Sequence, residues 1–247
     1  MTLGLEIFHN YGLNFLDRWA HVLAGITWIG LLYYFNFVQV PSFAQMDAAA
    51  RTNAIDKLAS RALWWFRWAA AATFGFGILL GLIPEASGEK AMFTRSGFFK
   101  STEGVAIATG MLLGITMFVN VWAVIWRNQK IVIANARGEN PAGDPAAAGR
   151  SATLASRMNT IFSFPMLFFM IGAVHFFPQG GFDTGSDRAI YWAVTLVIWA
   201  VLEANCLGLI GGKGQNLTNW IYEDHKRAIG AGLVLVVIWY ALWEIIF

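Results

Sequence analysis

Residues 105–126 read VAIATGMLLGITMFVNVWAVIW, an apolar run without a single charged side chain. A segment of about 20 apolar residues is long enough to cross the hydrocarbon core of a bilayer as a helix. The run is continuous and does not alternate between apolar and polar residues, which favours a helix over a strand of a transmembrane barrel. This stretch therefore predicts a membrane-spanning helix.

The composition of the whole chain also indicates that it is surrounded by lipid. Of the 247 residues, 57% are hydrophobic and 13% are charged, whereas soluble domains carry about 25% charged residues. Because lipid offers the backbone no hydrogen-bonding partners, such a chain crosses the membrane as helices or as a closed barrel. We expect an all-α polytopic transmembrane bundle, in contact with membrane lipid, that forms one domain over residues 1–247.

Five further runs have the length and composition of a span, so we predict six in all. They are residues 16–37, 63–82, 105–126, 158–177, 189–210 and 228–246. Lys and Arg are unevenly divided between the two sets of connections, with eleven on one side and five on the other. The eleven are Arg51, Lys57, Arg61, Arg127, Lys130, Arg137, Arg150, Arg157, Lys213, Lys226 and Arg227. Because cation-rich connections face the cytoplasm, both termini are expected outside.

Two of the cytoplasmic connections are long enough to have their own structure. Residues 41–60 are too polar to span and rich in helix formers, so they predict a cytoplasmic helix that leads into the second span. Residues 127–157 are expected to form a cytoplasmic loop. Its segment 138–149 reads GENPAGDPAAAG, and its glycines and prolines favour irregular structure.

Two histidines lie inside predicted spans that run in opposite directions. His21 is about 9 Å and His175 about 12 Å from the middle of its span, both toward the outer side. Two imidazoles at similar depth in a dry bundle suit the axial ligation of a haem. Arg18 and Arg188 are candidates to pair with the haem propionates. A lone intramembrane histidine can also simply bond to a neighbouring helix, and this interpretation stays open.

A second set of polar residues collects in the cytoplasmic half of the spans. It comprises Arg67, Asn120, Asn159, Glu203 and Asn205, with Asn36 and Gln39 nearby. Because an unpaired charge in the membrane is costly, we expect Arg67 and Glu203 to pair or to face a wet cavity. A salt bridge that fixes helix packing, a pocket for a small polar substrate and a route for protons all remain open, and no catalytic residue is assigned.

Two motifs carry a resemblance to a known family. The first is RWAH at Arg18–His21, followed by Gly25, WIG at 28–30 and YYFNF at 33–37. The second is SRMNT at 156–160, followed by Ser163, PMLFF at 165–169 and His175. Together they resemble the membrane domain of the PuuD-type membrane-bound urate oxidases. The first motif is also similar to the haem-binding membrane proteins that include the HemJ-type and CopD-like families. The resemblance implies a bundle that holds haem b, with His21 and His175 at matching positions.

Urate oxidases of this type continue into a c-type cytochrome domain, whereas this sequence ends at Phe247 and has one cysteine, Cys206, and no Cys-x-x-Cys-His motif. We therefore expect electrons to pass to a separate cytochrome c, to quinone or to a partner subunit.

The leading hypothesis is a bis-histidine, b-type haem electron-transfer protein of the bacterial inner membrane, with no nucleic-acid partner. Whether it is itself an oxidoreductase of the urate oxidase type stays open. The alternative is a non-catalytic subunit of a larger respiratory or oxidase complex. Copper handling of the CopD kind is disfavoured because the eight Met form no Met-x-x-Met pattern.

Overall fold

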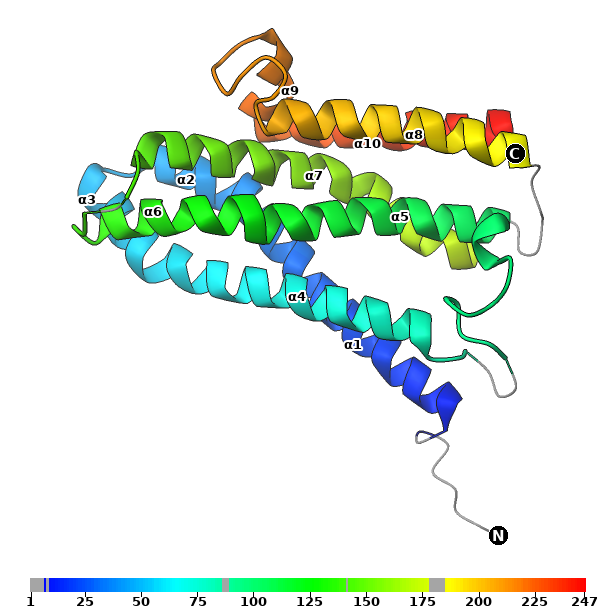
Figure 1. Ribbon diagram of the computed structural model, residues 1–247. Helices are drawn as coiled ribbons and strands as arrows, with labels where there is room; N and C mark the ends of the chain where they lie inside the picture. The colour runs from blue at the N-terminus through cyan, green and yellow to red at the C-terminus, as the bar shows by residue number, and fades with distance from the viewer. Residues whose placement is uncertain (1–6, 8, 86–88, 141, 178–184) are drawn as a thin grey trace.

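The computed structural model describes residues 7, 9–85, 89–140, 142–177 and 185–247, and within these ranges the chain is helical and contains no strand (Figure 1). The elements are α1 (Asn10–Tyr33), η2 (Tyr34–Gln39), α2 (Val40–Gln45), α3 (Ala48–Ala54), η3 (Ile55–Ala59), α4 (Ser60–Leu82), η4 (Phe98–Lys100), α5 (Thr102–Val119), η5 (Asn120–Ile125), α6 (Trp126–Ala136), α7 (Pro145–His175), α8 (Gly185–Cys206), η6 (Leu217–Asn219), α9 (Trp220–Glu223) and α10 (His225–Ile246). The predicted all-α polytopic class is confirmed.

Six helical runs are long and apolar enough to cross a membrane, so the chain is a multi-pass membrane protein. They are Asn10–Gln45, Ala48–Leu82, Thr102–Ala136, Pro145–His175, Gly185–Cys206 and His225–Ile246. Each contains most or all of one predicted span. The first four exceed 30 residues, which is more than a bilayer needs. Their surplus length lies at the end of the bundle remote from the start of α1 and the end of α10 (Figure 1). We call this the opposite end, and the one with the start of α1 and the end of α10 the terminal end.

The prediction of a loop over residues 127–157 is wrong for most of its length. Helix α6 continues to Ala136, and α7 already begins at Pro145. The start of α7 is determined by neighbouring residues. Asp144 accepts hydrogen bonds from the backbone N–H groups of Ala146 and Ala147, and Pro145 occupies the first turn. Between these helices, Gly138 and Gly143 have positive φ values of 73° and 135°, which glycine adopts readily.

Residues 41–60 are helical on both sides of a break. Helix α2 ends at Gln45, and α3 begins after Asp47, whose side chain accepts a hydrogen bond from the N–H of Ala50. Three of the runs also contain a π-helical segment, namely η2, η3 and η5. A π turn inserts an extra residue into a helix and is often found at functional sites. All three lie toward the opposite end.

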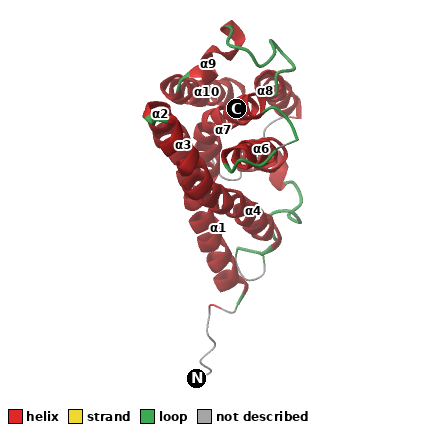
Figure 2. Ribbon diagram, turned by 90° about the vertical axis from the view of Figure 1, so that its left-hand side faces the viewer, coloured by secondary structure: helices red, strands yellow, loops and turns green. Residues whose placement is uncertain are grey.

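Helix α7 is the centre of the bundle, and its buried residues run from Ala148 to Ala173. Figure 2 shows α1 and α4 on one side of the molecule and α8, α9 and α10 on the other, with α7 between them. Small residues allow close approach: a Cβ on Gly110 of α5 would lie 2.9 Å from Met170 Cγ of α7, and one on Gly232 of α10 would lie 2.5 Å from Phe164 Cδ2.

Helices α1 and α4 form a pair that is less tightly tied to the rest. Gly25 of α1 faces Thr73 of α4, and Asn14 donates to the carbonyl of Ile83 at 3.0 Å. Toward its N-terminal end α1 runs obliquely away from α7 (Figure 1). The polar contacts between α1–η2 and α7 are therefore found near Tyr33 and Asn36, at the far end of α1.

Candidate functional site

His21 points from α1 toward α4. Its Nδ1 lies 2.9 Å from the carbonyl oxygen of Thr73. Because a carbonyl can only accept, Nδ1 carries the proton and donates, which leaves the Nε2 lone pair free. Gly77 makes room for the ring, since a Cβ there would lie 3.2 Å from His21 Cε1. A histidine held through one nitrogen by a carbonyl has the arrangement that metal-ligating histidines commonly show.

His175 is the last residue of α7, and its side chain is exposed. The hydrogen bond between Tyr33 Oη and Ser163 Oγ, 2.9 Å long, joins α1 to α7 and gives a reference point for the positions of the two histidines. His21 lies twelve residues before Tyr33, and His175 lies twelve residues after Ser163. Because α1 and α7 run in opposite directions, both histidines lie on the terminal-end side of this contact, each about 18 Å along its own helix. The two helices diverge toward the terminal end (Figure 1).

The two arginines considered for haem propionates have other partners. Arg18 Nη2 lies 2.8 Å from Glu85 Oε1 and 3.4 Å from Asn14 Oδ1, near the end of α4. Arg188 Nη1 donates to the carbonyl of Lys100 at 3.4 Å. Both arginines are partly exposed at the terminal end. These hydrogen bonds tie the two arginines to neighbouring segments at the terminal end.

Three members of the expected polar pocket form one buried network. Asn120 Nδ2 donates to Asn159 Oδ1 at 3.0 Å and to Glu203 Oε2 at 3.3 Å, and Asn159 Nδ2 donates to the carbonyl of Met117 at 2.9 Å. Asn159 is fully buried and Asn120 is 2% exposed. The network ties η5, α7 and α8 together, and every amide nitrogen in it is used.

A fourth polar group lies against the same helices. Tyr222 of α9 is fully buried, and its Oη lies 3.3 Å from the carbonyl of Leu202 and 3.4 Å from Met158 Sδ. Burial raises the pKa of the Tyr222 phenol. Tyr222 therefore stays protonated and acts as a donor that fixes α9 to the bundle.

The expected pairing of Arg67 with Glu203 is wrong. The Arg67 guanidinium carbon lies 3.7 Å from the centroid of the Trp126 ring, a cation–π contact. Glu203 bonds to Asn120, as described above. The two side chains contact different neighbours, and no salt bridge joins them.

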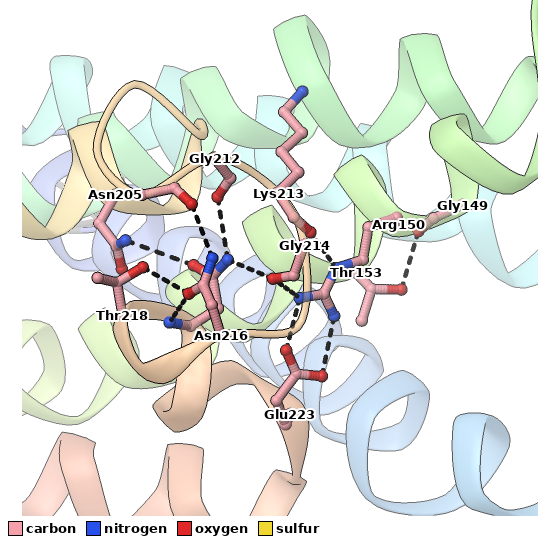
Figure 3. Close-up of polar contacts among 12 residues, drawn as sticks. Gly149, Arg150, Thr153, Asn205, Gly212, Lys213, Gly214, Asn216, Thr218 and Glu223 are labelled. Carbon is pink, nitrogen blue, oxygen red and sulfur yellow. Dashed lines mark hydrogen bonds and ion pairs between the residues drawn. The ribbon is translucent and has the colours of Figure 1, made fainter.

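Asn205 belongs to a separate structure, the connection between α8 and α10 (Figure 3). Its Nδ2 donates to the carbonyl of Ile210 at 3.0 Å and lies 3.4 Å from Asn219 Oδ1. Asn219, fully buried, donates in turn to the carbonyls of Gly212 and Gly214 at 3.0 and 2.7 Å. These bonds order a glycine-rich connection.

Arg150 of α7 also forms hydrogen bonds with this connection. Its Nη1 and Nη2 bond both carboxylate oxygens of Glu223, at 3.0 and 2.5 Å. Its Nε and Nη2 also donate to the carbonyls of Lys213 and Gly214, at 2.7 and 3.1 Å. We call Arg150, Glu223 and the carbonyls they hold the Arg150 clasp. Figure 3 shows the clasp joining α7 to the segment that precedes α10.

A small cavity of about 50 Å³ lies between η2, α4, α6 and α7. Asn36, Gln39 and Ser156 are among its lining residues, and Asn36 Nδ2 donates to Ser156 Oγ at 2.8 Å. Its volume suits a few water molecules and is far too small for a purine. None of the five residues of the expected polar pocket lines it.

Sequence reasoning missed Arg157 as a functional candidate and counted it only as a loop cation. It lies inside α7 and is 3% exposed. Its Nε and Nη1 are buried and have no hydrogen-bond partner. The available signal was its place in the SRMNT motif, between half-buried Ser156 and buried Asn159.

Comparison with known families now identifies the central part of the chain. Residues 90–205 match the family model described as urate oxidase N-terminal. The predicted resemblance is confirmed. The matched segment of this urate oxidase-like membrane domain begins before α5 and ends in α8, so it includes His175, Arg157, Asn120, Asn159 and Glu203 and leaves His21 outside. No curated protein and no solved structure matches the chain.

The donor chemistry of the two histidines is compatible with haem ligation. Among the described residues, no group of three or more His, Cys, Asp or Glu could hold an ion. A haem iron needs at most two ligands from the protein, and imidazole nitrogen is one of its usual ligands. His21 offers a free Nε2 on a ring already fixed by Thr73.

Proposed function

We propose that this urate oxidase-like membrane domain is a b-type haem electron-transfer protein of the bacterial inner membrane. His21 and His175 are its axial ligands, and the electrons pass to a separate cytochrome c, to quinone or to a partner subunit. The bound haem supplies one-electron redox chemistry. The protein's own residues hold it, orient the ligand rings and exclude water.

The observation that carries the proposal is the His21–Thr73 contact. It fixes the tautomer, points Nδ1 at a backbone carbonyl and leaves Nε2 as the metal-binding atom. Gly77 supports it, because any side chain at this position would press on the ring. The family match adds a second support, since it covers the helix that carries His175.

The register of α1 and α7 is the third support. Both histidines lie the same number of residues from the Tyr33–Ser163 contact, on helices that diverge from it. Ligation by both requires the two rings to face one porphyrin between the diverging segments. His175 is exposed at the last position of α7.

A reduced-minus-oxidised absorbance spectrum of the protein, purified in detergent, tests the proposal. We expect a b-type band in the wild type and its loss in both His21→Ala and His175→Ala, with folding retained. His9→Ala is the matched control, since His9 is exposed before α1. A folded wild-type protein that shows no band after haem reconstitution would contradict the proposal and favour the non-catalytic subunit.

Anaerobic addition of urate to the oxidised protein then separates an enzyme from a carrier. Appearance of the reduced band on urate addition would show oxidation of urate by this chain. Reduction by dithionite alone, with no response to urate, would leave an electron carrier that has a different donor.

A further inference from the structure

The cations at the opposite end of the bundle differ in whether an acidic residue of the chain neutralises them. Arg137 donates from Nε to Asp56 Oδ1 at 2.6 Å, and Arg150 is held in the Arg150 clasp. Arg127 and Lys130 of α6 are exposed, and among the described residues neither forms an ion pair. Their charge is therefore available to a partner outside the chain.

Arg127 and Lys130 line an open groove of about 620 Å³ on the outer side of α6. The remaining lining residues are Ala123, Asn128, Ile131, Ala134 and Ala142, and we call all seven the α6 groove. Residues three apart on a helix share a face, so the two cations are neighbours in it. Its volume is within the range of about 300–1,000 Å³ that is common for small-molecule sites.

The α6 groove crosses the edge of the third membrane span. Ala123 lies inside the predicted span 105–126, and Ala134 lies about 12 Å beyond its end. Arg127 and Lys130 follow the end of the span by one and four residues, which is about 2–6 Å. The headgroup layer on each side of a bilayer is about 5–7 Å deep. The two cations therefore lie at the level of the lipid headgroups.

Tryptophan rings beside the groove indicate the same level in the membrane. Lys130 Nζ lies 5.9 Å from the centroid of the Trp126 ring, which also receives the Arg67 guanidinium. Trp68 of α4 is exposed and packs edge-on against Trp122, with 5.5 Å between the ring centroids. Tryptophan is enriched at membrane–water interfaces. Arg67 adds a third positive charge to this part of the surface.

Exposed apolar side chains continue from the groove into the membrane. Val119 lies one turn before Ala123 and Ile115 one turn before Val119, and both are exposed. A spacing of four residues places them on one face of the helical run. A ligand that enters the groove from the bilayer therefore meets apolar surface with its body and cations with its head. This order matches a phospholipid, whereas a soluble anion would use only the cations.

We propose that the α6 groove binds an anionic phospholipid of the cytoplasmic leaflet, whose phosphate pairs with Arg127 and Lys130. Arginine can hold two phosphate oxygens at once, and lysine adds a compact charge. Basic sites at the cytoplasmic ends of membrane helices suit anionic lipid headgroups. The acyl chains lie along Val119 and Ile115. The site is separate from the proposed haem ligands, which lie toward the terminal end.

Native mass spectrometry of the detergent-purified protein tests the site by counting bound lipids. We expect the wild type to bind phosphatidylglycerol more tightly than phosphatidylcholine. In Arg127→Gln/Lys130→Gln the phosphatidylglycerol affinity should fall about tenfold, because two charge-assisted contacts are lost. Phosphatidylcholine binding should not change. Arg51→Gln/Arg61→Gln is the matched control, since it removes two exposed arginines at the same end and the same net charge.

A second variant obstructs the groove without changing its charge. Ala134 lines the groove and is partly exposed, so Ala134→Phe places a ring in it without disturbing the core. The affinity for phosphatidylglycerol should fall several-fold, and the Tm without lipid should stay the same. Wild-type affinity in this variant would show that the lipid does not occupy the groove.

Three further results would overturn the inference. One is equal affinity of the wild type for phosphatidylglycerol and phosphatidylcholine. Another is an equal loss of affinity in Arg51→Gln/Arg61→Gln, since any surface cation at this end would then serve. The third is displacement of phosphatidylglycerol by soluble glycerol phosphate at similar concentration, which would make the groove a site for free phosphate esters.

Discussion

Helices α5 and α1 meet the central helix α7 in different ways. Helix α5 follows α7 from the Asn120–Asn159 bond to the close approach of Gly110 and Met170. Helix α1 bonds α7 at Tyr33 and then diverges from it toward the terminal end. One interface is held along its length by small residues and buried amides, and the other is held by polar contacts only near Tyr33 and Asn36. The difference separates a part of the bundle that is fixed along its length from a part that is fixed near one end.

The largest loss of stability should follow from Asn159→Leu, which removes the centre of the fixed interface. The change removes the side-chain hydrogen bond to the Met117 carbonyl, which keeps its bond from the backbone N–H of Asn120, and takes an acceptor from the Asn120 side chain. Each buried group that loses its hydrogen bond costs about 1–3 kcal/mol, so we expect about 2–4 kcal/mol in total. Denaturant unfolding in detergent measures it. The control is Asn135→Ala on exposed α6, and equal stability of both variants would show that the buried amides do not fix this interface.

A smaller loss is expected from Arg150→Gln, which opens the Arg150 clasp. The clasp is a partly buried, bidentate pair, and its removal should cost about 1–2 kcal/mol. The local effect should be larger than the global one, because the α8–α10 connection loses its anchor. Limited trypsin digestion, followed by mass spectrometry, should show cleavage after Lys213 becoming several-fold faster. An unchanged cleavage rate at Lys213 would mean that Asn205 and Asn219 suffice to order the connection.

The smallest change in stability is expected in the part that is fixed near one end, with Gly77→Leu. A Cβ at Gly77 already lies 3.2 Å from His21 Cε1, so a leucine must displace the ring from Thr73. We expect the Tm without haem to change little and the b-type band to fall several-fold. Gly75→Leu is the matched control, because nothing lies within 4 Å of a Cβ at this exposed position of the same helix. Equal bands in the two variants would remove His21 from the haem site.

The sequence predicted some local features well and others poorly. The six spans are present because an apolar run of about 20 residues has no other stable place for its side chains. The caps at Asp144 and Asp47 were not predicted, although they depend on local chemistry, since a side-chain acceptor ahead of a helix satisfies its free N–H groups. The extension of α6 to Ala136 was missed because residues 127–136 are too polar to be recognised as part of a span, although they continue the helix.

The sequence identified the polar residues inside the spans but not the partner that each of them contacts. Arg67 and Glu203 are both intramembrane charges at similar depth, and the sequence cannot say that a tryptophan ring receives one and an asparagine the other. Asn120 and Asn159 were assigned to the same half of the membrane, and their bond depends on the rotation of two helices and on the π turn at η5. The unsatisfied state of Arg157 is likewise invisible in the sequence.

By itself, the sequence determined that the chain crosses a membrane as six helices, because lipid allows only helices or closed barrels and the continuous apolar runs favour helices. It also determined that His21 and His175 lie on antiparallel spans. Only the tertiary structure decided which partner each polar side chain meets, because a helix turns successive residues by about 100° and a small rotation changes the neighbour. For this reason His21 faces Thr73 on α4, and Arg157 keeps two free donors inside the bundle.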